Sequence, residues 1–350
     1  MNRFLFAVFV LLFHSSLFAS DWKQSLQHGA TAEELQALKQ KPNYGSPRFY
    51  PRLQADEVPA TDTADFKYVL LSSEASFSEA ENLRSTIAKN LPEGVKLVVL
   101  VEPYDLDHVK RTYSKSISLD RVIFAVSDNI SGGFWARDSF PYPVVNSKNE
   151  LSLVKAEYKR PFWSGPDIAK SLNLEMRNYD FTFVGGNLMA DHDGQCFSVK
   201  SPRLFDTTEN DLKSAYGCKS VHFFKHLQGI GDVDEVVKIL PNHKALTNNS
   251  AYVQELQELG YEVTLLPSIP NSFRTYANSL IVGQTAFMPT YGVSKDQEAK
   301  AVYESLGYKV IGIPSNTLSD DLQGSVHCQT MAYPAISEEA LLEALGAKRL

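Results

Sequence analysis

The sequence predicts an α/β fold. Short apolar runs typical of buried strands alternate with segments in which apolar residues recur at helical spacing. A strand, a helix and a second strand follow one another between residues 68 and 101, and helix–strand units recur over 252–266 and 294–313. Periodicity alone therefore predicts the class, while the units are too dissimilar in sequence to establish a repeat.

The first unit begins with the apolar run Tyr68–Leu71, which predicts a strand. Ser78 and Glu81 have the spacing of a capping box at the start of a helix. The apolar residues of that helix lie three or four positions apart: Ala80, Leu83, Ile87 and Leu91. Val95–Val101 predicts the next buried strand.

The later units follow the same plan. One helix face consists of Tyr252, Val253, Leu256 and Leu259. Gly260 lies where a helix C-cap is expected, and Tyr261–Leu266 predicts a strand. In the last unit Ser294 and Gln297 predict a second capping box, and Lys309–Ile313 predicts the strand that follows. The helix between them has its apolar face at Ala299, Val302, Tyr303 and Leu306.

The N-terminal region divides into two parts. Residues 1–20 predict a secretory signal peptide, because Arg3 precedes an apolar run, Phe4–Phe13, that is too short to cross a bilayer. Residues 21–65 predict a polar arm broken by prolines, with one short helix over Ala32–Lys39. The main domain then occupies 66–350. We expect a secreted or periplasmic protein that is not held in the membrane after signal cleavage.

Composition narrows the possible partners. Hydrophobic content of 43% and charged content of 21% are ordinary for a globular protein, and the net charge of -7 argues against nucleic acid. Three cysteines are present, Cys196, Cys218 and Cys328, so at least one thiol is free, and a Cys196–Cys218 bridge is possible. The sequence has no zinc-binding pattern and leaves the oligomeric state open.

Cys328 lies in a Gly- and Ser-containing segment, Gly324–Thr330. A nucleophilic cysteine needs partial exposure and surroundings that favour the thiolate. Four further segments precede it: Trp135–Asp138, Gly185–Asn187, Gly231–Glu235 and Asn278–Leu280. In this order, from about Phe66 to about Pro334, they resemble the bacterial agmatine deiminase and Porphyromonas-type peptidylarginine deiminase family of guanidine-modifying enzymes.

The resemblance implies a five-bladed pseudosymmetric α/β propeller, the pentein fold, with its site on the axis. It also implies hydrolysis of a guanidinium C–N bond, without metal or cofactor. Cys328 would attack the guanidinium carbon held by Asp138 and Asp234, ammonia would leave from a thiouronium intermediate, and water would release the ureido product. These residue types suit the chemistry, because paired carboxylates bind a guanidinium and a thiolate is a strong nucleophile.

One position departs from the family pattern. The family has a general acid/base histidine two residues before the second aspartate, where this chain has Asp232. If this segment is a strand, Asp232 and Asp234 point to the same face. Three alternatives remain open: Asp232 carries protons itself, another histidine replaces the missing one, or the protein only binds guanidinium groups. The candidate histidines are His226, His222, His192 and, as the weakest, His327.

The resemblance also implies a set of substrate-binding residues. Trp135, Asn187 and Asn278 would line the pocket, although Val184 replaces the acidic residue that usually precedes the two glycines. Arg160 matches the first arginine of a pair that holds the terminal carboxylate of a peptide, and Phe162 stands in place of the second. We therefore expect an arginine-containing peptide as the substrate, with agmatine or another small guanidino compound as the alternative.

Overall fold

The computed structural model describes residues 22–41, 44, 48, 50 and 56–335, so the predicted signal peptide at 1–20 lies outside it. In the described part of the chain, the strands form five sheets. No helix in this part has the length and apolar character needed to cross a membrane.

The sheets are mixed, as the alternating pattern predicts. Two sheets have four strands, in the spatial orders β1 (Val58–Pro59), β5 (Tyr142–Val145), β6 (Leu151–Glu157), β7 (Met176–Thr182) and β17 (Met331–Pro334), β2 (Phe66–Ser72), β3 (Lys96–Val101), β4 (Val122–Val126). Two of the three-stranded sheets have the orders β10 (Ser220–Lys225), β9 (Gln195–Lys200), β8 (Met189–Ala190) and β11 (Val237–Leu240), β12 (Lys244–Thr247), β13 (Glu262–Leu265). The remaining three-stranded sheet has the order β14 (Leu280–Val282), β15 (Thr285–Thr290), β16 (Lys309–Pro314).

Every sheet repeats one motif. An antiparallel pair such as β14–β15 is followed by a helix and then a strand parallel to the second, such as β16. The connecting helices are α3 (Ser78–Asn90), α4 (Leu106–Tyr113), α6 (Gly165–Leu172), α7 (Glu209–Ala215), α8 (Val253–Glu258) and α9 (Lys295–Ser305). A parallel neighbour requires such a crossover, so the helix–strand units of the sequence are units of these sheets.

The predicted elements near residues 66–101 and 253–314 are confirmed, but both capping boxes are wrong. Ser78 is already inside α3, and Glu81 bonds the side chain of Ser76 instead. Ser294 precedes α9 in a helical rather than an extended conformation and makes no capping bond. A capping side chain reaches the N3 amide only from an extended residue, so sequence spacing alone is insufficient.

The core lies between the helices and the sheets. In β3 every residue except Lys96 is buried, and Leu83 and Ile87 of α3 pack in the same cluster as Ile313 of β16. Each large apolar side chain buried in this way contributes about 1.5–3 kcal/mol. This packing holds neighbouring sheets together.

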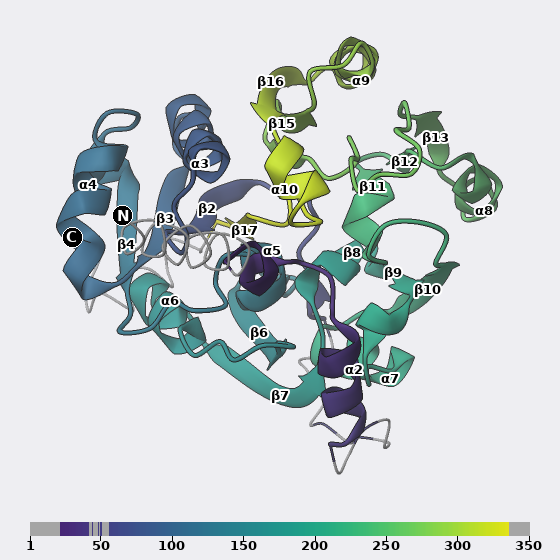
Figure 1. Cartoon of the computed structure of the whole chain (residues 1–350). Coiled ribbons are helices and arrows are strands. Elements are labelled where there is room, and N and C mark those ends of the chain that lie inside the picture. The colour runs from purple at the N-terminus through teal and green to yellow at the C-terminus, as the bar shows by residue number, and fades with distance from the viewer. Residues whose placement is uncertain (1–21, 42–43, 45–47, 49, 51–55, 336–350) are drawn as a thin grey trace, which may run out of the picture.

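The predicted motifs lie in the segments that lead into the strand that begins each repeated motif. These segments are α5 (Ala136–Ser139) before β5, η3 (Gly185–Asn187) before β8, η5 (Val233–Glu235) before β11, residues 275–279 before β14 and residues 325–330 before β17. Figure 1 shows α5 near the middle of the molecule with the sheets arranged around it. Motifs that are far apart in the sequence therefore occupy equivalent places in the fold.

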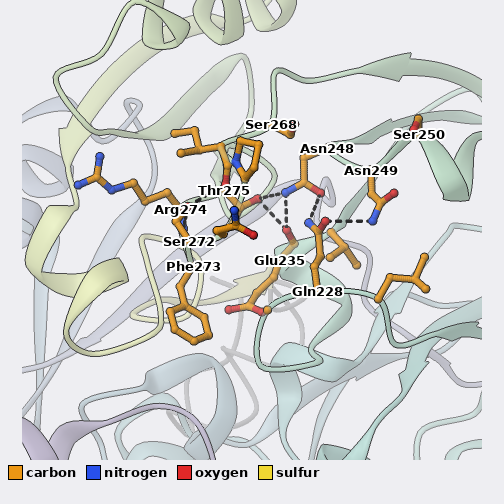
Figure 2. A pocket seen from close by; sticks show the side chains of 16 residues that line it. Gln228, Glu235, Asn248, Asn249, Ser250, Ser268, Ser272, Phe273, Arg274 and Thr275 are labelled. Carbon is orange, nitrogen blue, oxygen red and sulfur yellow. Dashed lines mark hydrogen bonds between the residues drawn. The ribbon is translucent and has the colours of Figure 1, made fainter.

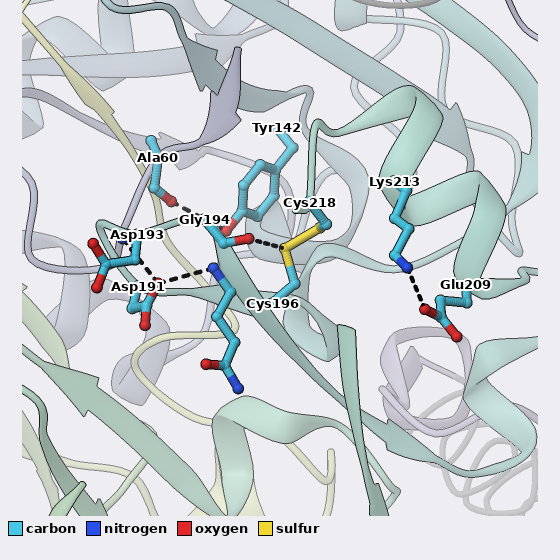
Figure 3. The surroundings of a disulfide bond; sticks show 10 residues. Ala60, Tyr142, Asp191, Asp193, Gly194, Cys196, Glu209, Lys213 and Cys218 are labelled. Carbon is cyan, nitrogen blue, oxygen red and sulfur yellow. Dashed lines mark hydrogen bonds and ion pairs between the residues drawn. A yellow bond between two sulfur atoms is a disulfide. The ribbon is translucent and has the colours of Figure 1, made fainter. Parts of the chain in front are cut away.

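The polar arm lies across this central region in Figure 1. The predicted helix α2 (Ala32–Lys39) has the expected bounds and begins with a capping box formed by Thr31 and Glu34, and residues 22–26 form a further helical turn that was not predicted. The end of the arm is less separate than predicted, because β1 pairs with β5. The possible disulfide between Cys196 and Cys218 is present beside β9 (Figure 3).

Candidate active site

Three buried carboxylates meet at the centre of the fold: Asp138 on α5, Asp232 before η5 and Asp234 on η5. A methyl group on Gly186 would lie 2.9 Å from Asp138 Oδ1, 3.1 Å from Asp232 Oδ2 and 3.4 Å from Asp234 Oδ2. Only glycine leaves room for the three carboxylates here, and its amide donates to Asp138 Oδ1 at 3.1 Å. Residues 233–235 form a 3-10 turn rather than a strand, but Asp232 and Asp234 both reach the centre, as strand geometry would also have required.

Arg203, on η4 (Pro202–Leu204), fills the space between two of these carboxylates. Its Nε donates to Asp232 Oδ1, and its Nη2 donates to Asp232 Oδ2 and to Asp138 Oδ2, each at 2.6 Å. Its Nη1 donates to the carbonyl oxygen of His28 at 2.7 Å. The side chain is 1% exposed. A guanidinium group of the chain itself is therefore bound to Asp138, one of the two carboxylates that the resemblance assigns to the substrate guanidinium, and to Asp232.

The three charged groups at the centre, Asp138, Asp232 and Arg203, have pKa values shifted in different ways. Burial alone would raise the pKa of Asp138, but His28 and Arg203 together hold it below its usual value. Burial raises the pKa of Asp232 to about 6 despite the Arg203 contact, and Asp138 adds to this rise. Asp232 and Asp138 hold the pKa of Arg203 well above its usual value against the opposing effect of burial. Asp232 is thus the carboxylate that protonates more readily, and Arg203 remains a cation.

The N-terminal arm closes the centre from one side. His28 Nε2 lies 2.7 Å from Asp138 Oδ2, and the imidazole lies against the Trp135 ring with 4.4 Å between centroids. The His28 amide donates to the carbonyl oxygen of Leu322 at 2.8 Å, and Trp135 Nε1 donates to that of Leu26 at 2.7 Å. Trp135, predicted to line the substrate pocket, is buried beneath the arm.

Two basic side chains, Lys159 and Arg160, hold the arm. Lys159 Nζ donates to the carbonyl oxygens of residues 28 and 29 at 2.5 and 2.7 Å. Arg160 donates through Nε to Glu34 Oε1 at 2.7 Å and through Nη1 to the carbonyl oxygen of Ser25 at 2.9 Å. The predicted ligand for a substrate carboxylate is therefore paired with a carboxylate of the arm.

Cys328 lies at the same centre, with Asn278 as its nearest polar partner. Asn278 Nδ2 is 3.0 Å from Cys328 Sγ, and its Oδ1 accepts from the amides of His327 and Cys328 at 3.0 and 3.3 Å. Asp234 Oδ2 is 3.7 Å from the sulfur. Burial, and then Asp234, raise the pKa of the Cys328 thiol well above its usual value. The expected thiolate-favouring, partly exposed setting is wrong for this structure, since Cys328 is fully buried.

His327 connects Asp234 to a second buried charge cluster. Its Nδ1 lies 2.7 Å from Asp234 Oδ2 and its Nε2 lies 2.9 Å from Asp62 Oδ2, the latter as an ion contact without a well-angled hydrogen bond. Lys238 Nζ and Arg137 Nη1 contact Asp62 at 3.0 and 3.3 Å. Burial opposes ionisation of Asp62, but His327, Lys238 and Arg137 hold its pKa well below the usual value. The predicted weakest histidine is thus the one of the four candidates that reaches the site.

The remaining candidates, Asn187 and three histidines, do not contact the central carboxylates through their side chains. Asn187 accepts from the amides of Val199 and Val233 through Oδ1 and donates to the carbonyl oxygen of Val199 through Nδ2, so it fixes η3 and η5 rather than facing a ligand. His222 pairs with Glu255, and His226 lies 3.2 Å from the carbonyl oxygen of Gly229. His192 is exposed on a distant turn.

A cavity of about 610 Å³ adjoins the centre on the η5 side (Figure 2). Asn248 Nδ2 and Thr275 Oγ1 both donate to the carbonyl oxygen of Glu235, and Gln228 bridges Asn248 and Asn249. Burial, and then Asp232 and Asp234, raise the pKa of Glu235 well above its usual value. The cavity is lined by residues 227–229, 235–236, 248–250 and 268–275, and none of the three central carboxylates is among them.

Residues 70–334 match the family described as Porphyromonas-type peptidyl-arginine deiminase. This chain belongs to that family. The match covers the motifs from β2 to β17, so Asp138, Asp234 and Cys328 lie within the family region. No curated protein sequence matches the chain.

Solved structures share the fold. Agmatine deiminase from C. jejuni is 16% identical with a TM-score of 0.64, covering 83% of this chain and 98% of its own. Agmatine deiminase of Enterococcus faecalis is 15% identical with a TM-score of 0.66, covering 82% and 99%. A putative arginine deiminase from Porphyromonas gingivalis is 18% identical with a TM-score of 0.65, covering 79% and 98%. The five-bladed pentein fold predicted from the resemblance is confirmed.

Three residues of the site were missed in the sequence: Arg203, His28 and Asp62. Arg203 lies outside every family motif, in Ser201-Pro202-Arg203-Leu204. His28 and Asp62 belong to the segment interpreted as a polar arm. The replacement of a histidine by Asp232 was a signal for a new cation, since a buried carboxylate needs a partner.

Proposed function

We propose that this chain is an exported member of its family in which the side chain of Arg203 occupies the guanidinium site. While Arg203 stays in place, the protein does not deiminate guanidino compounds from solution. The observation that supports this most is the double ion pair of Arg203 with Asp138 and Asp232. Four of the five N–H donors of the guanidinium are used inside the protein. A substrate arginine would have to displace this group.

The missing family histidine supports the same proposal. General acid/base help is worth roughly 10²–10⁴-fold in rate. Asp232 is committed to Arg203, and His327 lies between Asp234 and Asp62, so neither is free to exchange protons with a departing ammonia. His28 lies 3.3 Å from Arg203 Nη2, but it enters with the arm that closes the site.

Export is supported by two observations. The N-terminal apolar run has the length of a signal peptide, and the Cys196–Cys218 disulfide is typical of proteins in oxidising compartments. Both observations support a location in the periplasm or outside the cell.

A second candidate function is deimination of peptidyl-arginine, with agmatine as the alternative substrate. It is favoured by the contacts of Cys328 with Asn278 and Asp234, because the family scheme has Cys328 attack a guanidinium carbon held by Asp138 and Asp234. It requires that Arg203 and the arm move away before the thiouronium intermediate can form.

The two candidate functions predict different rates of guanidinium hydrolysis. Ureido product and ammonia are measured with a peptide ending in arginine, its amidated form, agmatine and free arginine, with Cys328→Ser as the blank. We expect wild-type values equal to this blank. Turnover by the wild type that is lost in Cys328→Ser would contradict the proposal and establish the second function.

Occupation of the guanidinium site by Arg203 can be tested without measuring catalysis. Arg203→Ala should leave a buried site for a guanidinium ion, so millimolar methylguanidine should raise the melting temperature of this variant and not that of the wild type. Arg274→Ala, which removes an exposed ion pair with Asp320, is the matched control and should show no such rise. No rise in Arg203→Ala would count against a guanidinium site at this position.

A further inference from the structure

Two turns of neighbouring sheets bring three potential metal ligands together on the surface. His192 and Asp193 lie in the turn between β8 and β9, and His243 lies in the turn between β11 and β12. One ligand atom from each residue can be chosen so that all lie within 4.8 Å of one another. The two turns are about 50 residues apart in sequence, and the three side chains are exposed, whereas the central carboxylates are buried.

The distances fit a transition-metal ion after small side-chain rotations. His243 Nε2 lies 3.5 Å from Asp193 Oδ2, and the imidazoles of His192 and His243 are 5.7 Å apart between centroids. Ligand atoms bound tetrahedrally to zinc at about 2.0–2.1 Å lie roughly 3.3–3.4 Å apart. All three side chains are exposed, so the rotations that close this gap meet no core packing.

The first turn is held in place. Asp191 Oδ1 accepts from the amides of Asp193 and Gln195 at 3.0 and 2.9 Å, and Tyr261 donates to its Oδ2. The disulfide at Cys196 lies next along β9, as Figure 3 shows beside Asp191 and Asp193. A turn fixed in this way loses little conformational entropy when its side chains bind an ion.

The second turn has an unusual backbone at the ligand itself. Asn242 and His243 both have positive φ values, 60° and 52°. Residues other than glycine are uncommon in this region, although Asn and His are tolerated better than most. The His243 carbonyl oxygen accepts from the Glu262 amide at 2.7 Å, and its ring lies 5.6 Å from that of Tyr261. The residue that anchors the first turn, Tyr261, thus also packs against the histidine of the second.

We propose that His192, Asp193 and His243 form a binding site for a divalent transition-metal ion of the zinc class. Two imidazoles and one carboxylate suit zinc, cobalt, nickel or copper, whereas magnesium and calcium prefer oxygen ligands alone. Three protein ligands leave a position open for water or a small anion. His192 also borders a cleft of about 680 Å³ together with Asn146 and Asn149, from which such a ligand can reach the ion.

The described residues contain a second group of potential metal ligands, but this group is not available to bind a metal ion. His28, Asp138 and Asp232 are also within 4.8 Å of one another, but the Arg203 guanidinium is already bonded to both carboxylates. A fixed cation in that position excludes a metal ion. The surface site is therefore independent of the central site and of the function proposed for it.

The test uses the untagged chain after treatment with a chelator. Zinc binding is measured by calorimetric titration and by competition with a chromogenic chelator, and cobalt is used as a spectroscopic probe. We expect one equivalent of zinc, with affinity reduced at least about tenfold in His192→Ala, in His243→Ala and in Asp193→Asn. His108→Ala, a change at an exposed histidine on α4, should bind zinc as the wild type does.

Three results would overturn the proposal. The first is the absence of stoichiometric zinc binding. The second is unchanged binding in His192→Ala and His243→Ala, which would mean an adventitious ion only. A cobalt spectrum with a strong thiolate charge-transfer band would also place the ion at Cys328 instead. Circular dichroism of each variant shows that the fold is retained, so a lost site is not confused with a lost structure.

Discussion

Arg203 and Asp232 form a buried two-point ion pair, with Nε–Oδ1 and Nη2–Oδ2 distances of 2.6 Å. Position 232 is where the family pattern has a histidine. A histidine there could not accept two parallel N–H bonds from a guanidinium, whereas a carboxylate does so readily. The aspartate at 232 and the arginine at 203 are therefore complementary, and under the proposed function this internal salt bridge occupies the guanidinium site.

The first prediction concerns this salt bridge. Arg203→Met removes the cation and leaves Asp138 and Asp232 buried without it, so we expect a loss of about 3–5 kcal/mol in the free energy of unfolding. Arg203→Met with Asp232→Asn should be less destabilised than the single variant, because one uncompensated carboxylate is gone. Urea denaturation of both proteins and of Asp232→Asn gives the coupling energy. A loss below about 1 kcal/mol in Arg203→Met would contradict a tightly held pair.

The second prediction concerns activity. Asp232→His alone should stay inactive, because Arg203 remains in the guanidinium site and then faces a histidine instead of a carboxylate. Arg203→Ala with Asp232→His frees the site and returns the family histidine, so ureido product from arginine peptides should rise by about 10²-fold or more over Asp232→His. Adding Cys328→Ser to the double variant should remove the gain. Equal rates in Asp232→His and the double variant would show that Arg203 does not block the site.

The fold could be predicted largely from sequence, because helical spacing in Ala80–Leu91 and apolar runs such as Val95–Val101 reflect burial on one face or on both. The capping boxes failed because they depend on one backbone conformation, which residue types alone do not determine. Position in the five-sheet arrangement depends on tertiary contacts between sheets, and the sequence indicated it only through the family resemblance.

The site was predicted in part. Asp138, Asp232, Asp234, Asn278 and Cys328 meet, because each lies in a segment leading into the strand that begins one repeat of the common motif. The Arg203 guanidinium that occupies the site could not be predicted from such motifs. Arg203 follows β9 and His28 lies in a segment with almost no apolar pattern, so neither has a local signal. Their places depend on charge complementarity with carboxylates that are distant in sequence.

The third prediction concerns the thiol. Cys328 is fully buried and its pKa is raised, so a haloacetamidine probe should label the native protein slowly at neutral pH. His28→Ala removes the contact of the arm with Asp138 and should increase the labelling rate. Ser147→Ala, on an exposed turn, is the control and should not change the rate. Fast labelling of the wild type, blocked by an arginine peptide, would show that the site opens readily.

The fourth prediction concerns pH. Burial, together with Arg203 and Arg160, lowers the pKa of Lys159 from 10.5 to about 7. A lysine with a lowered pKa binds its proton more weakly in the folded state than in the unfolded state. The folded protein therefore bears a cost below pH 7, and this cost decreases as the pH rises from 7 towards 10.5.

Between pH 7 and 9 this group should add about 2 kcal/mol to the free energy of unfolding of the wild type. Lys159→Met cannot titrate, so its stability should lack this rise even though it also loses the bonds to the carbonyl oxygens of residues 28 and 29. The readout is the difference between the two pH profiles from urea denaturation, in which the other titrating groups cancel. Lys148→Met, on an exposed turn, should follow the wild-type profile. Parallel profiles for the wild type and Lys159→Met would mean that Lys159 keeps its proton, and that the arm is held by a charged lysine.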